Sequence, residues 1–241
     1  MVRLILDFLD KNNLPAEAQL RRKTISEYAA RLAFDAARAA FANFPDDTIV
    51  SHHESGAPYF ESESFAPSVG FADTSLEEGG NLSPDPLNIF LGARGMSQSD
   101  RGSLPHLSIS HAQNAILVGI SDKEIGVDIE PVAPLRESVL RRAFNLGERN
   151  YVNAEEDHDK AFAEVWTRKE ALCKAEGKGL KFALTNSVCD EYGALTFIPS
   201  KDGTKKWRLK TYFEPQKGSD IIYCISVCAE DTSLPRGVLS N

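Results

Sequence analysis

The stretch EIGVDIEPV, Glu124 to Val132, has the pattern of a β-strand with two acidic side chains on one face. Side chains alternate along a strand, so Val127 and Ile129 point to one face. Asp128 and Glu130 point to the other face, with their Cα atoms roughly 6.5 to 7 Å apart. Two carboxylates at that spacing can chelate one hard cation. Taken alone, however, the stretch favours an ordinary half-exposed antiparallel strand with a polar outer face.

A second stretch, VWTRKEALCKAEGKGL at residues 165–180, changes that balance. Lys169 falls in the middle of an apolar helical stripe, where an ammonium is costly unless an anionic group receives it. Glu170 and Lys174 also fit an ordinary i,i+4 surface pair, but such a pair leaves Lys169 unexplained. A third carboxylate for a metal, with two lysines for phosphate oxygens, explains all three residues. The stripe consists of Phe162, Val165, Trp166, Leu172 and Cys173.

The surrounding pattern predicts a mixture of helices and antiparallel strands. The runs HLSISH, AILVGI and EIGVDIE predict a three-stranded antiparallel meander, which puts Ser110 and His111 one hairpin away from Asp128. A lone strand histidine is more often structural, but this one could reach the same anionic ligand. Helices are predicted at 135–144 and 157–176, the second ending before Gly177, and strands at 184–190, 194–199, 206–213 and 221–228. No regular structure is expected after residue 229.

The N-terminal half contains one or two helices and a long irregular segment. Residues 15–44 repeat Ala, Leu and Arg at helical spacing. Residues 61–103 are rich in Ser, Gly, Pro and Asp and carry few periodic apolar positions, which is typical of a surface insertion.

Composition excludes several classes of protein. With 241 residues and 42% hydrophobic content, the chain can form one large domain or two small ones. A net charge of −8 argues against general attraction to nucleic acid. No segment approaches the roughly 20 apolar residues of a membrane span, and the four cysteines lack metal-site spacing. We therefore expect a cytoplasmic monomer with reduced thiols and with neither nucleic acid nor a membrane as partner.

Four motifs together resemble one family. GVDIE, then WTRKEALCK, with SISH and GAPYF upstream, is similar to the 4′-phosphopantetheinyl transferases of the surfactin-synthetase-activating (Sfp) type. The two halves of the signature are specific as a pair, and EGKGL directly after the second half supports it. The resemblance runs from about Leu107 to Leu180 and is faint in the N-terminal half.

The resemblance implies an α+β fold with a pseudo-twofold arrangement of two similar halves. The first half would comprise residues 1–112, with the insertion 61–103, and the second half, residues 113–241, would carry the metal site. Both would have antiparallel sheets, with coenzyme A bound in the cleft between them. The implied activity is Mg²⁺-dependent transfer of 4′-phosphopantetheine from coenzyme A to a serine of an apo carrier protein. The carrier itself, acyl, peptidyl or polyketide, is left open.

The resemblance also implies a role for individual residues. Asp128, Glu130 and Glu170 would hold Mg²⁺, and Glu170 would act as the base. Lys174 would neutralise the leaving 3′,5′-ADP, and Lys169 would fix the acidic cluster or the phosphates. The remaining contacts to coenzyme A would come from Gly56, Pro58, Ser110 and His111.

The chain departs from the family at three places. Ala57 stands where the family has Lys in its GKP motif, residues 61–103 replace a shorter connection, and the N-terminal region is short. The residues that would bind the 3′-phosphate of coenzyme A cannot be matched to the family one by one, and the candidates are Arg22, Lys23 and Arg31.

Two other interpretations use the same residues. A restriction-type nuclease also carries Asp-x-Glu with later Glu and Lys, but the acidic balance argues against it. A non-catalytic regulator could bind a carrier or nucleotide without turnover, but none of the acidic and basic residues has been lost. In the transferase interpretation, the candidate docking surface for the carrier is the segment 134–144, where Arg136, Arg141 and Arg142 stand beside apolar residues. A solvated helix that packs its apolar side inward explains this segment equally well.

Overall fold

The computed structural model describes residues 2–41, 44–53, 57–62, 104–177, 186–190, 193–195, 197–200, 203–230 and 239–240. The predicted insertion at 61–103 therefore lies outside the described residues, apart from its first two positions. Gly56 lies outside them as well. No helix in the described ranges is long and apolar enough to cross a membrane.

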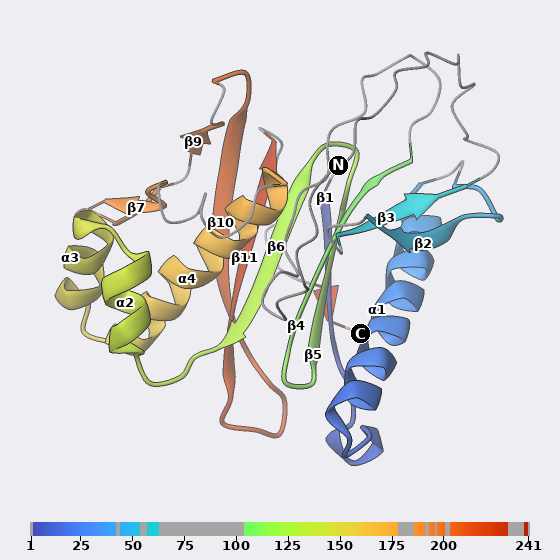
Figure 1. The fold of residues 1–241 in the computed structure, drawn as a ribbon, viewed down its shortest axis with the longest axis horizontal. Coiled ribbons are helices and arrows are strands. Elements are labelled where there is room, and N and C mark those ends of the chain that lie inside the picture. The colour runs from blue at the N-terminus through green and yellow to red at the C-terminus, as the bar shows by residue number, and fades with distance from the viewer. Residues whose placement is uncertain are drawn as a thin grey trace, which may run out of the picture.

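Two four-stranded sheets form the centre of the molecule (Figure 1). The first sheet has the order β12-β1-β5-β4, in which β1 is antiparallel to β5 and parallel to β12. The second has the order β6-β11-β10-β9 and is antiparallel throughout. The strands of the first sheet are β1 Val2–Phe8, β4 His106–Ala112, β5 Ala115–Ser121 and β12 Leu239–Ser240, and those of the second are β6 Ile125–Pro131, β9 Phe197–Pro199, β10 Lys206–Pro215 and β11 Ile222–Glu230.

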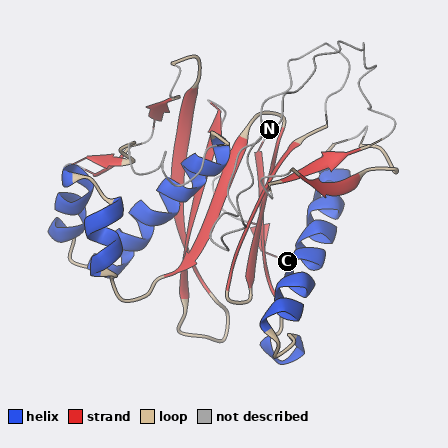
Figure 2. Cartoon of the chain, in the orientation of Figure 1, coloured by secondary structure: helices blue, strands red, loops and turns tan. Residues whose placement is uncertain are grey.

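Helices cover the outer faces of the two sheets (Figure 2). The first sheet is covered by α1, and the second by α4. The four α-helices are α1 Ala18–Ala40, α2 Glu137–Ala143, α3 Leu146–Ala154 and α4 His158–Ala175. The shorter elements are the 3-10 helix η1 Lys11–Asn13 and the strand pairs β2 Ile49–His52 with β3 Pro58–Glu61, and β7 Cys189–Asp190 with β8 Gly193–Ala194.

The two sheets pack face to face through an apolar core. Leu4 and Leu117 of the first sheet and Val127, Ile129 and Ile225 of the second belong to this one buried cluster. The chain thus forms four layers, helix, sheet, sheet and helix. This layering confirms a mixed fold of helices and antiparallel sheets.

The predicted meander is correct for β4 and β5 but wrong for β6. Instead of continuing beside β5, β6 pairs with β11 at the edge of the second sheet. The apolar side of β6 packs across the face of β5, and a Cβ added to Gly119 would lie 2.5 Å from Val127 Cγ1. A glycine at this position therefore lets the two sheets approach closely.

Several other elements differ from the sequence prediction. The N-terminal helical pattern forms one helix, and the prediction missed β1, the β2–β3 pair and α3. The expectation that the tail lacks regular structure is wrong for Leu239 and Ser240, which pair with β1. α4 begins and ends as predicted, with Asp157 as its N-cap and Gly177 at a positive φ of 61° beyond its C-terminus.

Candidate active site

Asp128 lies at the centre of the polar group that joins β6, β4 and α4. The residue is only 6% exposed. Its Oδ1 accepts hydrogen bonds from Ser110 Oγ and from Lys174 Nζ, both at 2.8 Å. A half-exposed strand with a solvated polar face would not bury this carboxylate, so that interpretation of GVDIE is wrong for Asp128.

Gly126 allows α4 to lie directly on β6. A Cβ at this position would be 2.0 Å from the backbone oxygen of Ala171 and 2.4 Å from the backbone nitrogen of Ala175. Any side chain here would push the helix away from the strand. The glycine of GVDIE is therefore what brings Lys174 within reach of Asp128.

Side chains satisfy the backbone of Val127 at the outer edge of β6. The amide of Val127 donates to Ser108 Oγ at 3.0 Å, and its carbonyl accepts from Lys174 Nζ at 2.9 Å. Because β6 is an edge strand next to β4, these bonds replace the ladder that a neighbouring strand would supply. Ser108 and Ser110 of SISH thus connect the first sheet to the acidic strand of the second.

Two further carboxyl groups, those of Glu130 and Glu170, interact electrostatically with Asp128. Burial, followed by the charge of Asp128, raises the pKa of Glu130 to about 7, against the lowering influence of Arg136 and Lys174. Burial and Asp128 likewise raise the pKa of Glu170 to about 7, and Glu130 contributes in the same direction. Three acids share this region with one closely bound lysine, so negative charge is in excess.

The donor set suits a hard divalent cation. Within the described residues, Asp128 Oδ2 is a buried acceptor without a hydrogen-bond partner. Carboxylate oxygens are the preferred protein ligands of Mg²⁺. No three acidic, His or Cys side chains in the described ranges converge closely enough to form a ready-made metal site. The residues therefore fit a cation in their chemistry and charge, but they are not pre-arranged around one.

His111, near the end of β4, interacts electrostatically with the same group. Desolvation, followed by the charge of Lys174, lowers the pKa of His111; Arg22 of α1 also lowers it and Asp128 raises it. Arg22, one of the candidate residues for the 3′-phosphate, therefore interacts electrostatically with His111. The other two candidates have contacts of their own, since Lys23 pairs with Glu27 and Arg31 lies over the ring of Tyr28.

Lys169 is buried as its place in the apolar stripe predicts, and an anion receives it. Its ammonium is 2.9 Å from Glu148 Oε1 and also donates to Asn186 O at 2.9 Å. Glu148 is fully buried and accepts further bonds from the amides of Val188 and Asn145. These contacts tie Lys169 to α3 and to residues 186–188. A phosphate contact by Lys169 stays a prediction.

The structure describes part of the region expected at the adenine. Pro58 begins β3 and pairs with His52 of β2. The next residue, Tyr59, stacks on His53 with 4.1 Å between ring centroids. Since β3 contacts β4, this small sheet adjoins the strand that carries Ser110 and His111.

A small cavity of about 240 Å³ lies next to Glu130. It is open to solvent, and most of its lining is apolar. The lining residues are Glu130, Pro131, Ala133, Pro134, Arg136, Phe162, Ala163 and Trp166.

Comparisons with known proteins agree with the motifs. The family described as the 4′-phosphopantetheinyl transferase superfamily matches residues 124–222, which include β6, α4 and β10. A 4′-phosphopantetheinyl transferase of Bacillus subtilis is 28% identical over 64% of this chain and 69% of its own length. Residues 124–222 are therefore similar to the 4′-phosphopantetheinyl transferase superfamily.

Further 4′-phosphopantetheinyl transferases match shorter parts of the chain. The 4′-phosphopantetheinyl transferase Sfp of Bacillus subtilis strain 168 is 29% identical over 55% of this chain and 58% of its own length. The 4′-phosphopantetheinyl transferase AcpT of Salmonella typhimurium is 35% identical over 40% of this chain and 52% of its own length. The chain thus spans little more than half the length of these two relatives.

Sequence reasoning missed three residues of the site region, namely Ser108, Gly126 and Glu148. Glu148 had a readable signal, because it stands three positions after Asn145 in a capping box at the start of α3. Ser108 carried no signal beyond its place in SISH. Gly126 is part of the GVDIE motif, but the sequence does not show that it lets α4, more than 30 residues later, lie against β6.

Proposed function

We propose that this chain transfers the 4′-phosphopantetheine group of coenzyme A to a serine of an apo carrier protein, releasing 3′,5′-ADP. The observation that carries the proposal is the buried Asp128, held by Ser110 and Lys174 with Glu130 and Glu170 coupled to it. The names of the matched relatives support the same activity.

The reaction asks the protein mainly for proton transfer and charge compensation. The serine oxygen forms a bond to the phosphorus that carries pantetheine, and the bond from that phosphorus to the oxygen of 3′,5′-ADP breaks. Glu170, which belongs to the same acidic group as Asp128, would be the general base that takes the serine proton. Lys174 is the cation next to Asp128 and would stabilise the charge that develops on the leaving phosphate.

Asp128, Glu130 and Glu170 would hold the divalent cation, for which we propose Mg²⁺. The orphaned Oδ2 of Asp128 and the raised pKa values of the two glutamates support this ligand set. When bound, the cation would supply positive charge to the pyrophosphate. Without it, the three acids repel one another.

We further propose that coenzyme A binds in a cleft between two related halves. Each sheet carries one long helix on its outer face, which supports a pseudo-twofold arrangement. The halves would be residues 1–112 and 113–241, with β5 and β12 of the second half completing the sheet of the first. Ser110 and His111, with Arg22 beside them, would contact phosphates, and Gly56 and Pro58 the adenine. Lys169 would support the acidic cluster through Glu148.

The proposed setting is a cytoplasmic monomer. All four cysteines are buried thiols, which agrees with a reducing compartment. The partners would be coenzyme A and a carrier protein, and neither nucleic acid nor a membrane is proposed. The cavity beside Glu130 offers an apolar surface for the uncharged pantetheine arm.

The test of the metal assignment is Asp128→Asn. The amide carries no charge to offset the cation, so we expect transfer to fall by at least about 100-fold while the protein stays folded. Asp122→Asn, at an exposed position of the β5–β6 turn, is the matched control and should keep full activity. Full activity of Asp128→Asn, or transfer that continues in excess EDTA, would overturn the assignment.

A further inference from the structure

A line of three hydroxyl groups lies between α4 and the second sheet. Ser226 Oγ is 2.8 Å from Thr167 Oγ1 and 3.1 Å from Thr211 Oγ1. Thr167 and Ser226 are completely buried. Their neighbours in the same layer are mainly apolar, so three hydroxyls are an unusual choice for this position.

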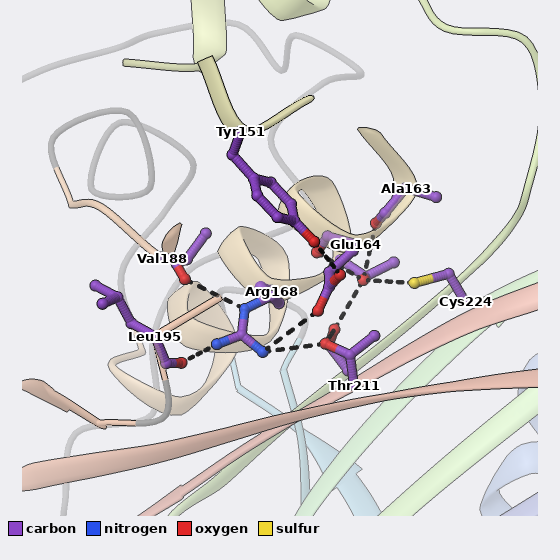
Figure 3. Close-up of polar contacts among 10 residues, drawn as sticks. Tyr151, Ala163, Glu164, Arg168, Val188, Leu195, Thr211 and Cys224 are labelled. Carbon is purple, nitrogen blue, oxygen red and sulfur yellow. Dashed lines mark hydrogen bonds and ion pairs between the residues drawn. The ribbon is translucent and has the colours of Figure 1, made fainter. Parts of the chain in front are cut away.

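The two ends of the line fix its direction. At one end, Arg168 Nη1 donates to Thr211 Oγ1 at 3.1 Å, and a guanidinium can only donate (Figure 3). At the other end, Thr167 Oγ1 is 2.9 Å from the carbonyl oxygen of Ala163, which can only accept. The protons therefore run from Thr211 to Ser226, from Ser226 to Thr167, and from Thr167 to Ala163. Thr167 Oγ1 also lies 3.2 Å from the carbonyl oxygen of Glu164 and 3.3 Å from Cys224 Sγ. Every hydroxyl of the line thus has both a donor and an acceptor partner.

Arg168 is itself held firmly in the layer. It is only 2% exposed and donates to the backbone carbonyls of Val188 and Leu195, and Glu164 lies 3.9 Å away (Figure 3). Glu164 in turn accepts from the hydroxyl of Tyr151 at 2.8 Å. The donor end of the hydroxyl line is thus anchored to segments outside α4.

The register of the sheet connects this line to Asp128. Ser226 of β11 lies directly opposite Asp128 of β6 on one side and opposite Thr211 of β10 on the other. Directly opposite residues share one face of a sheet, so all three point toward α4. On the helix, Thr167 precedes Glu170 by three positions and Lys174 by seven, which places all three on one side of α4.

We propose that Thr167, Ser226 and Thr211 are positioning residues, which set the rotation and depth of α4 so that Glu170 and Lys174 meet Asp128. An apolar layer would allow small shifts of the helix, because apolar contacts have no direction. A directed line of hydrogen bonds permits one placement only. The expected effect on kcat rests on the proposed transferase function. The placement of α4 by the three hydroxyls does not depend on that function.

The first test compares Thr167→Val with Thr167→Ser in the full-length chain. Valine keeps the shape and removes the hydroxyl, so we expect kcat for phosphopantetheine transfer to fall about 10- to 100-fold, as small misplacements of catalytic groups do. KM for coenzyme A should change less than threefold, and serine should restore at least half of kcat. Thr24→Val is the matched control, because Thr24 makes the same bond to the carbonyl four residues earlier, Leu20 O, but on α1. It should leave kcat unchanged.

A second measurement does not depend on activity. If Thr167 positions Lys174, the variants Thr167→Val and Lys174→Met should not act independently on the unfolding equilibrium constant. The change in this constant for the double variant should then differ at least about twofold from the product of the changes for the two single variants. Ser226→Ala replaces Thr167→Val if the latter does not fold. An active wild type whose Thr167→Val variant keeps kcat and shows no coupling would overturn the inference while the proposed function stands. An inactive wild type with clear coupling would overturn the proposed function alone.

Discussion

At the scale of single residues, the acidic group destabilises the protein when no cation is bound. Glu130 and Glu170 have a pKa near 7 in the folded protein, against 4.5 as the ordinary value. The folded state therefore binds their protons more tightly than the unfolded state does. Their stabilising contribution is complete below pH 4.5 and is lost as the pH rises to about 7. Stability without a divalent cation should fall across that window.

Glu170→Gln tests this electrostatic cost. Since glutamine does not ionise, the cation-free variant should be about 2 kcal/mol more stable than wild type at pH 8 and equally stable near pH 4.5. Urea unfolding in EDTA measures the difference, with the exposed Glu155→Gln as control. Mg²⁺ should stabilise the wild type more than the variant. A wild type whose stability does not change between pH 4.5 and 7 would contradict the expectation.

Lys169→Met tests whether the buried lysine serves the fold or the phosphates. Methionine leaves Glu148 charged, fully buried and without its ammonium, so we expect a loss of about 3 to 5 kcal/mol in unfolding free energy. Lys160→Met, which removes a half-exposed pair with Asp157, should cost less than about 1 kcal/mol. If Lys169→Met keeps wild-type stability and instead binds coenzyme A weakly, the phosphate role is the correct one.

At the scale of elements, the contact between β6 and α4 determines the site. Gly126→Ala should cost more than about 3 kcal/mol, because the added methyl group meets rigid backbone atoms of α4. Gly119→Ala meets first the side chain of Val127, which can shift, and should cost about 1 to 3 kcal/mol. Both are measured by urea unfolding. Equal stabilities of the two variants would mean that α4 can move away from β6 at little cost.

Sequence reasoning was most successful where one element carries its own signal. The periodicity of residues 157–176 predicted α4, alternation predicted β4, and strand-like runs predicted β5, β10 and β11. The partner of β6 was not predictable, because alternation records which side chains share a face but not which strand lies alongside. For the same reason Lys169 predicted a buried anion without indicating which of the 35 acidic residues it is. The short paired segment at Leu239 and Ser240 depends entirely on β1.

At the scale of the whole molecule, the net charge of −8 gives no long-range attraction to an acidic carrier. The candidate docking helix α2 buries its apolar side, since Leu140 and Phe144 belong to the core beneath it. Its exposed surface carries Arg141 and Arg142, and Leu146 at the start of α3 is 66% exposed. A docking surface here would therefore rest on arginines and one leucine.

Reversing the two arginines tests this surface. Arg141→Glu with Arg142→Glu should raise KM for the carrier about 10-fold and leave KM for coenzyme A unchanged, because the two ligands would use different surfaces. Lys11→Glu with Lys217→Glu makes the same change in net charge at exposed positions elsewhere. Unchanged carrier kinetics in the first variant, or equal effects in both, would exclude this docking surface.

The most direct measurement of the central claim is the mass of an apo carrier protein after incubation with this chain, coenzyme A and Mg²⁺. The account predicts that the carrier gains the mass of one phosphopantetheine group, that 3′,5′-ADP appears in equal amount, and that replacing the acceptor serine with alanine abolishes both. A panel of acyl, peptidyl and polyketide carriers that all keep their apo mass with the folded wild-type chain would contradict it.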